Sequence, residues 1–401
     1  MDMVTSVFIF FCTLLVWIMT PGIALFYGGL VRRKNVLSTA MHSFSALAIV
    51  SLLWIIVGYS LAFSGDGVFI GDLNNAFLHG VGFQGPEGST IPPNLFMMFQ
   101  LTFAIIATGI LTGSIAERMY FPAFLVFIVG WLLFIYAPVA HWAWGHGWFE
   151  RIGAIDFAGG TVVHITSGVA GLVLAIMLGH RKTNEPLAPH NLPLTIIGGI
   201  LVWFGWYGFN VGSAGAFNEI AMVAFINTNT AAVSGIVGWV AIEWMLIKKP
   251  TMLGVISGAL AGLVGITPAA GFVSTGASVI IGLIAGGVCF WAISSLKKRL
   301  KYDDALDAFG LHGVGGVWGS IATGLFASKQ VNPAIENGLF YGNASMLGAQ
   351  LVATLATFAY AAAVSFVLII LIKRVWPIRV DSEKEHLGLD ASLHGERAYQ
   401  D

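Results

Sequence analysis

Charged residues are scarce in this chain. Only 10% of its 401 residues are Asp, Glu, Lys or Arg, whereas 57% are hydrophobic. A water-soluble domain of this size needs a polar surface that such a composition does not supply. The shortage of charge therefore excludes an ordinary soluble domain and predicts a protein that lies in the lipid bilayer.

Cysteine is nearly absent, and neither sign of charge is in excess. Cys12 and Cys289 lie in separate apolar stretches without CxxC spacing, so we interpret both as core residues and expect no metal or other cofactor. With a formal net charge of -1, nucleic acid is not an expected partner. The first apolar run, 4–30, lacks a basic n-region and an Ala-x-Ala cleavage site, so we expect it to be retained as a helix.

Long apolar runs recur from one end of the sequence to the other. Each is close to the roughly 20 residues that an α-helix needs to cross about 30 Å of hydrocarbon. The predicted fold is an all-α polytopic membrane protein in which the 50 glycines allow close helix packing. We expect about eleven transmembrane helices, at 4–30, 35–63, 93–115, 120–140, 157–179, 192–213, 218–246, 251–268, 275–296, 305–327 and 343–373.

The basic residues predict the orientation of these helices. Lys and Arg fall on alternate connections and near the C-terminus, with Arg151 and Lys329 as the exceptions. Because cytoplasmic loops carry the basic excess, we expect the N-terminus outside and the C-terminus in the cytoplasm. We divide the chain into a transmembrane domain, 1–378, and a cytoplasmic tail, 379–401. The polar, mixed-charge composition of the tail is also that of a disordered terminus.

Two histidines lie at matching places in the expected helices 157–179 and 305–327. His164 follows Asp-Phe-Ala-Gly-Gly, and His312 follows Asp-Ala-Phe-Gly. The two helices run in opposite directions, as an inverted repeat of five plus five helices requires. Each histidine lies roughly 10 Å into its helix, measured from opposite faces, so the pair brackets the bilayer midplane. A polar side chain at that depth is expected to face the bundle interior or a cavity, although a bond to a backbone carbonyl explains each histidine taken alone.

Aromatic side chains gather toward the expected outer ends of several helices. Phe103, Trp144, Trp206 and Phe209 are among them, and Ser213 follows closely. Because tryptophan and tyrosine are common at lipid interfaces, anchoring explains most such residues. The functional hypothesis is that a ring face attracts a small cation, worth up to about 2 kcal/mol when desolvated. Trp144 has that ring, and Ser213 has a hydroxyl to accept one of the hydrogen bonds of the cation.

A carboxylate precedes each histidine-bearing helix. Asp156 lies near the expected outer mouth, where it can cap unpaired N–H groups and also attract a cation. Asp307 is its counterpart in the repeat, near the inner face. We interpret both first as structural and electrostatic supports.

Four stretches closely resemble the ammonium transporter (Amt/Mep/Rh) family, prokaryotic Amt type. They are Pro-Gly-Ile-Ala-Leu-Phe-Tyr-Gly-Gly-Leu-Val-Arg at 21–32, Asp-Phe-Ala-Gly-Gly-Thr-Val-Val-His at 156–164, Trp-Phe-Gly-Trp-Tyr-Gly-Phe-Asn at 203–210 and Ile-Thr-Pro-Ala-Ala-Gly at 266–271. The resemblance runs over nearly the whole chain. Tyr207 departs from the Phe of many relatives.

The resemblance implies a homotrimer of eleven-helix subunits that carry ammonium or ammonia across a cell membrane, by implication a prokaryotic plasma membrane. It implies that the tail packs beneath neighbouring subunits and meets a PII signalling protein. It also implies roles for individual residues: Trp144, Phe103 and Ser213 recruit the substrate, Phe103 and Phe209 form the pore gate, His164, His312 and Trp206 line the pore, and Asp156 supports the outer site.

Three other functions remain open at this point. An ammonium sensor would signal through the tail, although no signalling domain follows Arg379. A Rh-like gas channel would share the histidines. An intramembrane metal-dependent catalyst using His164 and His312 would need a third ligand, which no nearby Asp, Glu or Cys supplies. We expect a transporter and not an enzyme, with no catalytic residues.

Overall fold

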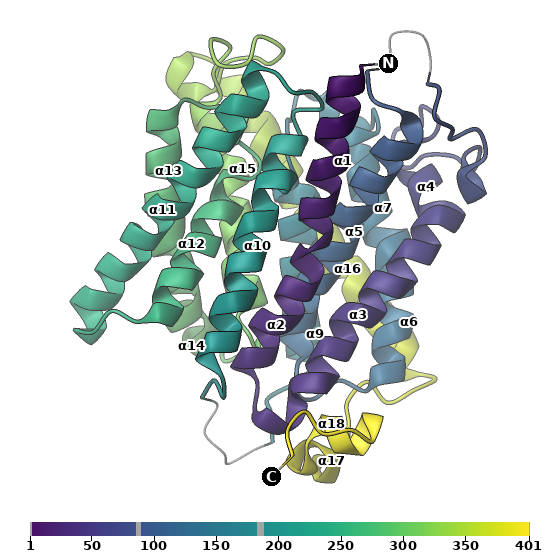
Figure 1. Cartoon of the computed structure of the whole chain (residues 1–401), viewed down its shortest axis with the longest axis vertical. Helices are drawn as coiled ribbons and strands as arrows, with labels where there is room; N and C mark the ends of the chain where they lie inside the picture. Colours follow the sequence, from purple (N-terminus) through teal and green to yellow (C-terminus); the bar gives the residue numbers. More distant parts are fainter. Residues whose placement is uncertain (1, 86–89, 183–187, 401) are drawn as a thin grey trace.

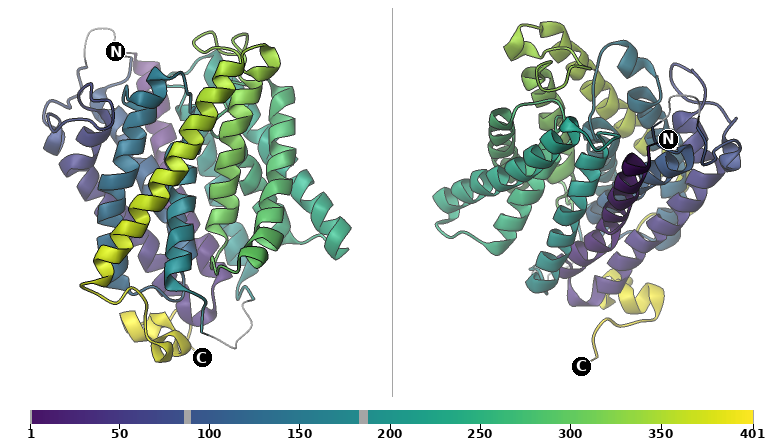
Figure 2. Two further views of the ribbon diagram at one scale, coloured as in Figure 1. Left: turned by 180° about the vertical axis from the view of Figure 1, so that it is seen from behind. Right: turned by 45° about the horizontal axis from the view of Figure 1, so that its top comes forward.

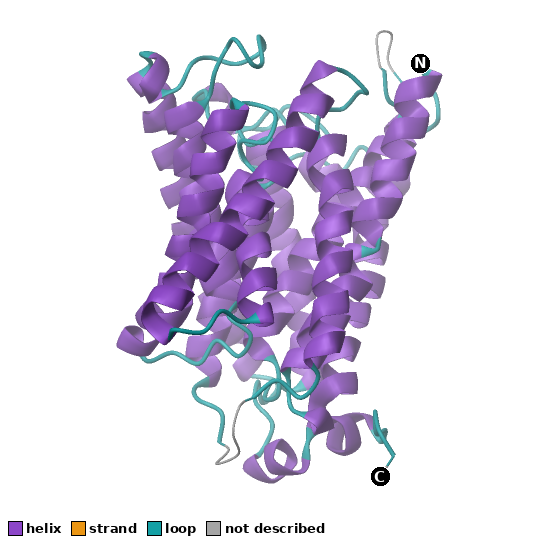
Figure 3. Ribbon diagram, turned by 60° about the vertical axis from the view of Figure 1, so that its left-hand side comes forward, coloured by secondary structure: helices purple, strands orange, loops and turns teal. Residues whose placement is uncertain are grey.

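The computed structural model describes residues 2–85, 90–182 and 188–400. Within them the regular structure is helical, and extended pairing is limited to an isolated bridge between Met119 and Arg379 (Figure 3). The first half of the chain forms α1 (Met3–Trp17), α2 (Met19–Leu30), α3 (Val36–Leu53), α4 (Tyr59–Phe63), α5 (Pro93–Ile115), α6 (Phe121–Trp131), α7 (Ala137–Trp144), α8 (Trp148–Arg151) and α9 (Thr166–Leu178). The second half forms α10 (Leu192–Gly212), α11 (Glu219–Ile247), α12 (Met252–Ile266), α13 (Thr275–Trp291), α14 (Lys297–Leu300), α15 (Val314–Phe326), α16 (Ala344–Lys373), α17 (Ser382–Leu387) and α18 (Leu389–His394).

Several spans contain a wider π-helical turn. These segments are η2 (Trp54–Gly58), η4 (Leu132–Tyr136), η5 (Gly160–Ile165), η6 (Ala292–Leu296) and η7 (Phe309–Gly313). Short 3₁₀ turns add η1 (Arg33–Asn35), η3 (Ala76–Leu78) and η8 (Leu339–Tyr341). Because π-turns inside helices are frequent at functional sites, η5 and η7, which carry the two histidines, are of particular interest.

Short polar side chains start many of the long helices. A side-chain oxygen of the residue before the helix accepts a backbone N–H of the first turn, which satisfies a donor that has no partner within the helix. The residues that do so are Asp2 for α1, Asn191 for α10, Asn218 for α11, Thr251 for α12, Ser274 for α13 and Asn343 for α16.

The long helices stand side by side in one bundle (Figures 1 and 2). The N-terminus lies at one end and the C-terminus at the other, and we call the latter the tail end. Helix α10 packs on α1 and α2, α11 packs on α12 and α13, and α16 runs obliquely across α6, α9 and α15. Large apolar side chains such as Phe10, Val237 and Leu355 remain exposed on the outer surface, where a bilayer would cover them.

Each predicted transmembrane range coincides with helix. Nine helices of the described part of the chain are long and apolar enough to cross a membrane. The range 251–268 corresponds to the shorter apolar helix α12, and 305–327 corresponds to η7 with α15. The range 4–30 differs in detail because it is broken at Ile18 into α1 and α2.

The two histidine-bearing segments touch through glycine. A Cβ atom placed on Gly168 would lie 2.3 Å from the backbone nitrogen of Gly313. No larger side chain fits there, so the two backbones approach as closely as a helix pair in lipid can. The contact fixes α9 against η7 just beyond His164 and His312.

A buried ion network closes the tail end. The carboxylate of Glu117, 2% exposed, lies 2.9 Å from Nε of Arg32 and 3.1 Å from Nη1 of Arg181. Arg181 also pairs with Asp303 at 2.8 Å. Burial by itself raises the pKa of Glu117, but the guanidinium charges outweigh it and hold that pKa below its usual range. Burial also raises the pKa of Asp303, but Arg181 and Arg118 outweigh this effect and hold that pKa well below its usual range.

The tail packs on this network as two short helices (Figure 1). Glu385 is fully buried and pairs with Arg379 at 2.6 Å. The carboxylate of Asp390 accepts the backbone N–H of Ser38 at 2.7 Å, in the first turn of α3. Asn35 accepts the N–H of Leu389 at 2.8 Å. The alternative of a disordered tail therefore does not hold for residues 379–400.

Candidate functional site

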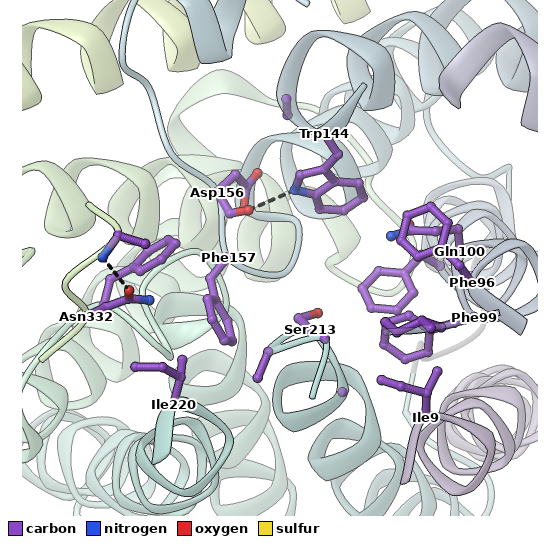
Figure 4. Close-up of a pocket in the computed structure, with 18 of the residues that line it drawn as sticks. Ile9, Phe96, Phe99, Gln100, Trp144, Asp156, Phe157, Ser213, Ile220 and Asn332 are labelled. Atoms are coloured by element: carbon purple, nitrogen blue, oxygen red, sulfur yellow. Dashed lines mark hydrogen bonds between the residues drawn. The ribbon is translucent and has the colours of Figure 1, made fainter. Parts of the chain in front are cut away.

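A pocket of about 540 Å³ opens at the end of the bundle opposite the tail (Figure 4). Its walls are mostly aromatic and aliphatic, with a few polar side chains, the composition typical of a small-molecule site. The predicted recruitment residues Trp144, Phe103 and Ser213 all line it, although they come from α7, α5 and the end of α10. Other lining residues include Ile9, Phe96, Phe99, Gln100, Asp156, Phe157, Asn218, Ile220 and Asn332.

The Trp144 ring is held from two sides. Its indole N–H donates to the backbone carbonyl of Asp156 at 2.8 Å (Figure 4). Its ring meets that of Phe103 edge to face, with centroids 5.9 Å apart. Because the N–H is satisfied by the protein, no free indole donor competes with a cation that approaches the ring.

Ser213 follows the last turn of α10. Its hydroxyl donates to the carbonyl of Phe209 at 2.9 Å. A hydroxyl that donates in one direction still has lone pairs to accept a hydrogen bond in another. Ser213 can thus accept an N–H from a ligand in the pocket.

The floor of the pocket is a pair of stacked phenylalanine rings. Phe103 and Phe209 have centroids 4.1 Å apart and planes inclined by 23°. Phe103 lines the outer pocket, whereas Phe209 lines a second cavity deeper in the bundle. Both side chains are about 1% exposed. The stacked rings therefore separate the two spaces.

The deeper cavity holds the two histidines. It measures about 10 Å³, close to the smallest space that holds one water molecule. Apart from His164 and His312 its walls are apolar or aromatic, and they include Trp206 and Phe209. The ring of His164 stacks on Trp206 at 5.4 Å between centroids. Trp206 is itself fixed because its indole N–H donates to the hydroxyl of Thr267 at 2.9 Å.

The two imidazoles are joined directly. Nδ1 of His164 and Nδ1 of His312 lie 3.2 Å apart. Since one nitrogen must donate and the other accept, the two rings share a single proton between them. Nε2 of His164 has no hydrogen-bond partner among the residues that the structure describes. This nitrogen therefore keeps a hydrogen-bonding capacity that the described residues do not use.

The local backbone explains how His164 reaches the cavity. Gly159 has φ +118°, a left-handed conformation that side chains rarely adopt, and it directly precedes η5. Asp156 secures the turn because its carboxylate accepts the N–H groups of Gly159, Gly160 and Thr161, each at 2.8 Å. The hydroxyl of Thr161 also donates to it, at 2.5 Å. The capping expected of Asp156 is thus present in the structure.

The counterpart of Asp156 behaves differently. The N–H of Phe309, at the start of η7, donates to Asp304 at 2.7 Å. Asp307, with φ +62°, instead pairs with Lys297 at 2.6 Å. Asp304, and not Asp307, therefore occupies the place that Asp156 has before the other histidine-bearing segment. Asp307 contributes a charge pair at the tail end.

The sequence reasoning missed several residues of the pocket. Gln100 lies in the outer wall, and its Oε1 is buried without a partner in the described part of the chain. It is a polar residue within the apolar run 93–115, a signal that could have identified it. Phe26 and Tyr27 line the deeper cavity. They lie within the stretch 21–32, where no single residue had been selected.

No metal centre is evident at either cavity. Across residues 2–85, 90–182 and 188–400, no group of three or more His, Cys, Asp or Glu side chains is placed to hold an ion. Within these ranges, no third ligand of the kind that a catalytic zinc site needs accompanies the histidine pair.

Comparison with known proteins connects this geometry to a function. The model of the Ammonium Transporter Family matches residues 7–399. The chain belongs to this family. An ammonium transporter of Bacillus subtilis (strain 168) is 61% identical over 402 residues and covers all of both chains. The ammonium transporter Amt1 of Archaeoglobus fulgidus is 48% identical over 391 residues, covering 96% of this chain and 97% of its own. Members of the ammonium transporter family are transporters or channels rather than enzymes.

Solved structures agree with the ammonium transporter assignment. The fold matches Saccharomyces cerevisiae Mep2 with a TM-score of 0.88 at 37% identity, over 95% of this chain and 91% of that one. A structure titled Sensor Amt Protein matches with a TM-score of 0.90 at 31% identity, over 98% of each chain. The chain therefore has the all-helical membrane fold of the Amt and Mep proteins.

Proposed function

We propose that this chain transports ammonium through the path marked by the two cavities. The observation that carries the proposal is their order: a wide aromatic pocket, a stacked ring pair and a narrow apolar cavity with a joined histidine pair. An unpaired ion in the middle of a bilayer is heavily penalised. Such a path suits a substrate that enters as a cation and crosses the centre in a neutral form.

Recruitment takes place at the outer pocket. The ring faces of Trp144 and Phe103 attract the cation, and Ser213 accepts one of its N–H groups. The Asp156 carboxylate keeps its hydrogen bonds to the backbone and adds negative potential at the mouth. Ammonium gives up a proton here to water in the pocket, which returns it to the outer solution or passes it on toward the histidine pair. Phe103 with Phe209 then opens to let ammonia through.

The histidine pair then lines the lower path with Trp206. Because the two imidazoles share a proton, one donates while the other accepts. The pair can therefore form a hydrogen bond with ammonia as it passes, or transfer a proton in parallel with ammonia. Two coupled imidazoles titrate as a unit, so a pKa belongs to the pair and not to either histidine.

The remaining features of the proposal concern topology and assembly. We infer eleven transmembrane helices in an inverted five-plus-five repeat, with the N-terminus outside and the tail in the cytoplasm. The domains are the conducting part, 1–378, and the regulatory tail, 379–401. The subunit forms a homotrimer in a prokaryotic plasma membrane, and the tail is where a PII protein would act. The location of the two termini at opposite ends of the bundle supports an odd number of crossings.

A second candidate is an ammonium sensor that binds at the same pocket and signals through its tail. It rests on the likeness to the structure titled Sensor Amt Protein. A Rh-like gas channel is a third, and it would carry a neutral gas without recruiting a cation. An ammonium pulse separates the sensor from the other two, and a variant of the recruitment site separates the gas channel from the transporter.

The test is an ammonium pulse applied to proteoliposomes, with membrane current and internal pH recorded together. Current shows that a proton moves with ammonia, whereas an internal pH rise without current shows that ammonia crosses alone. We expect the His164→Ala, His312→Ala double variant to lose the response. His79→Ala, an exposed histidine outside the path, should keep it. Folded protein that gives neither signal would refute transport and favour the sensor.

A Trp144→Leu variant tests recruitment separately. It removes the ring face but keeps an apolar side chain, so the half-saturating ammonium concentration should rise about tenfold, in line with a cation–π contribution of 1–2 kcal/mol. A gas channel would show no such change, because it does not bind the cation.

A further inference from the structure

The segment 64–72, which we call the outer strap, lies against the end of α7. Consecutive backbone carbonyls of the strap each accept a hydrogen bond from α7 or α8. In chain order, the carbonyls of Asp66, Gly67, Val68 and Phe69 lie 2.8 Å from Nη2 of Arg151, 2.6 Å from Nε2 of His141, 3.1 Å from the backbone nitrogen of Trp148 and 2.6 Å from the indole nitrogen of Trp142. Guanidinium, backbone and indole nitrogens only donate, so the strap acts as an acceptor along this stretch.

His141 differs from the other donors because both of its ring nitrogens face carbonyl oxygens. Nε2 lies 2.6 Å from the carbonyl of Gly67, and Nδ1 lies 3.0 Å from the carbonyl of Ala62, at the end of α4. A carbonyl oxygen can only accept, and a neutral imidazole has a single N–H. A neutral ring would therefore point one nitrogen lone pair at an oxygen lone pair. The doubly protonated imidazolium donates to both carbonyls.

Glycines around His141 leave room for this arrangement. A Cβ atom on Gly145 would collide with the Ala62 carbonyl and lie 2.7 Å from Nδ1 of His141. A Cβ atom on Gly147 would lie 2.6 Å from the carbonyl oxygen of His141. That oxygen accepts the N–H groups of both glycines. The ring and backbone of His141 therefore determine the turn that directly follows Trp144.

The surroundings of the ring favour a positive charge although His141 is 0% exposed. His141 lies in the last turn of α7, and Ala62 lies near the end of the long helical span Arg33–Phe63. Helix carboxyl ends carry partial negative charge, and hydrogen bonds from an ionised donor are stronger than neutral ones.

Other titratable groups on the neighbouring segments have partners of their own. They are Tyr59, Asp66, Asp72, His146, Glu150 and Arg151. Glu150 pairs with His146 at 3.2 Å, and the carboxylate of Asp72 accepts the hydroxyl of Ser64. Among the described residues, the ring of His141 bonds to the two carbonyls and to none of these groups. The two carbonyls therefore determine which protonation state of the ring fits.

We propose that His141 is a positioning residue of the recruitment site, held as an imidazolium that fastens the outer strap to α7. The inference rests on the proposed function, in which the Trp144 ring attracts ammonium. His141 and Trp144 are three residues apart on α7, so they are neighbours on the helix surface. Loss of the ring proton breaks one of the two bonds, so the strap loosens and recruitment weakens as the solution on the strap side becomes alkaline.

Nitrogen NMR of the full chain in proteoliposomes, with isotope-labelled histidine, tests the protonation of the ring. The His141→Gln variant identifies the signal, because it removes that histidine alone. We expect a histidine with both ring nitrogens protonated at neutral pH. A neutral His141 ring in the folded protein would overturn the proposal. Since this measurement requires no transport, its outcome is independent of the proposed function.

Hydrogen exchange of the same samples tests the fastening of the strap. His141→Gln keeps an amide donor but no charge, so exchange of the strap and of the Trp148 N–H should become faster. His79→Gln, at an exposed position of the same outer loop, is the matched control and should change nothing. In the unmodified chain, raising the pH should remove the imidazolium signal and the protection of the strap together, relative to the rest of the bundle. Protection that survives loss of that signal would contradict the role of the charge.

The ammonium pulse tests the effect on recruitment. The half-saturating ammonium concentration of His141→Gln should rise about threefold, less than the roughly tenfold rise for Trp144→Leu, because the Trp144 ring is displaced and not removed. A folded His141→Gln variant with unchanged strap exchange and unchanged half-saturation would overturn the positioning role. If the unmodified chain gave no ammonium response, the proposed function would fail while the NMR result still stood.

Discussion

Replacing Asp156 should destabilise the turn that presents His164 to the deeper cavity. The carboxylate accepts three backbone N–H groups and one hydroxyl, and hydrogen bonds to a charged group contribute about 1.5–3 kcal/mol each. These contributions are not additive, and the half-buried site lets water replace part of them. We therefore expect Asp156→Ala to cost about 3–5 kcal/mol of unfolding free energy. Asp156→Asn keeps one acceptor oxygen and should cost about 1.5–3 kcal/mol.

The assay is thermal unfolding of the detergent-purified protein beside the ammonium pulse in proteoliposomes. For a chain of this length, we expect the Asn variant to lower Tm by about 2–4 °C and the Ala variant by more. Transport should fall in the same order, because η5 begins at the capped turn. Asp66→Asn, at an exposed position, controls for loss of a negative charge. If Asp156→Ala retained the unmodified Tm, the capping argument would be refuted.

Three further outcomes follow from the packing and the tail-end network. Gly168→Ala should lower both Tm and transport, at a packing cost of about 1–3 kcal/mol, because its Cβ would collide with Gly313; Gly348→Ala, with open space around it, should do neither. Glu117→Gln should cost about 3–5 kcal/mol in thermal unfolding, since it leaves buried guanidiniums without their carboxylate, and an unchanged Tm would contradict this. Because folding depresses the pKa of Asp303, the stability that its carboxylate contributes should be complete above about pH 4 and be lost as the pH falls further. An Asp303→Asn variant should therefore lose less Tm between pH 5 and pH 3 than the unmodified protein, and an equal loss in the two proteins would contradict the depressed pKa.

The transmembrane helices were predictable because a single physical quantity determines them. The length of each apolar run reports whether a helix can cross the bilayer, and each predicted range coincides with helix. The same reasoning placed His164 and His312 at matching depths. It could not foresee that their Nδ1 atoms meet, since that contact depends on Gly168 lying against Gly313. Such proximity arises from packing between segments far apart in the chain.

Other features were hidden because they depend on local backbone geometry. The π-turns of η5 and η7 shift hydrogen bonds by one residue, and nothing in the apolar pattern reports such a shift. Asp307 was chosen as the counterpart of Asp156 from its place in the repeat, but it pairs with Lys297 while Asp304 accepts the N–H of Phe309. Glu117 was not selected from the sequence, because its pairing with Arg32 and Arg181 depends on loops that are far apart in the chain.

The bond between Asp390 and Ser38 also has a consequence for the order of assembly. The two residues are 352 positions apart, yet the carboxylate supplies an N-terminal hydrogen bond to α3. A ribosome adding about 5–20 residues per second needs roughly 20 to 70 s to travel that distance. During that interval α3 is already made while its partner has not been synthesised. One of the first helices of this sequence therefore completes its first turn only after Asp390 has been synthesised, so the docked tail marks that the whole stretch from α3 to Asp390 has been made.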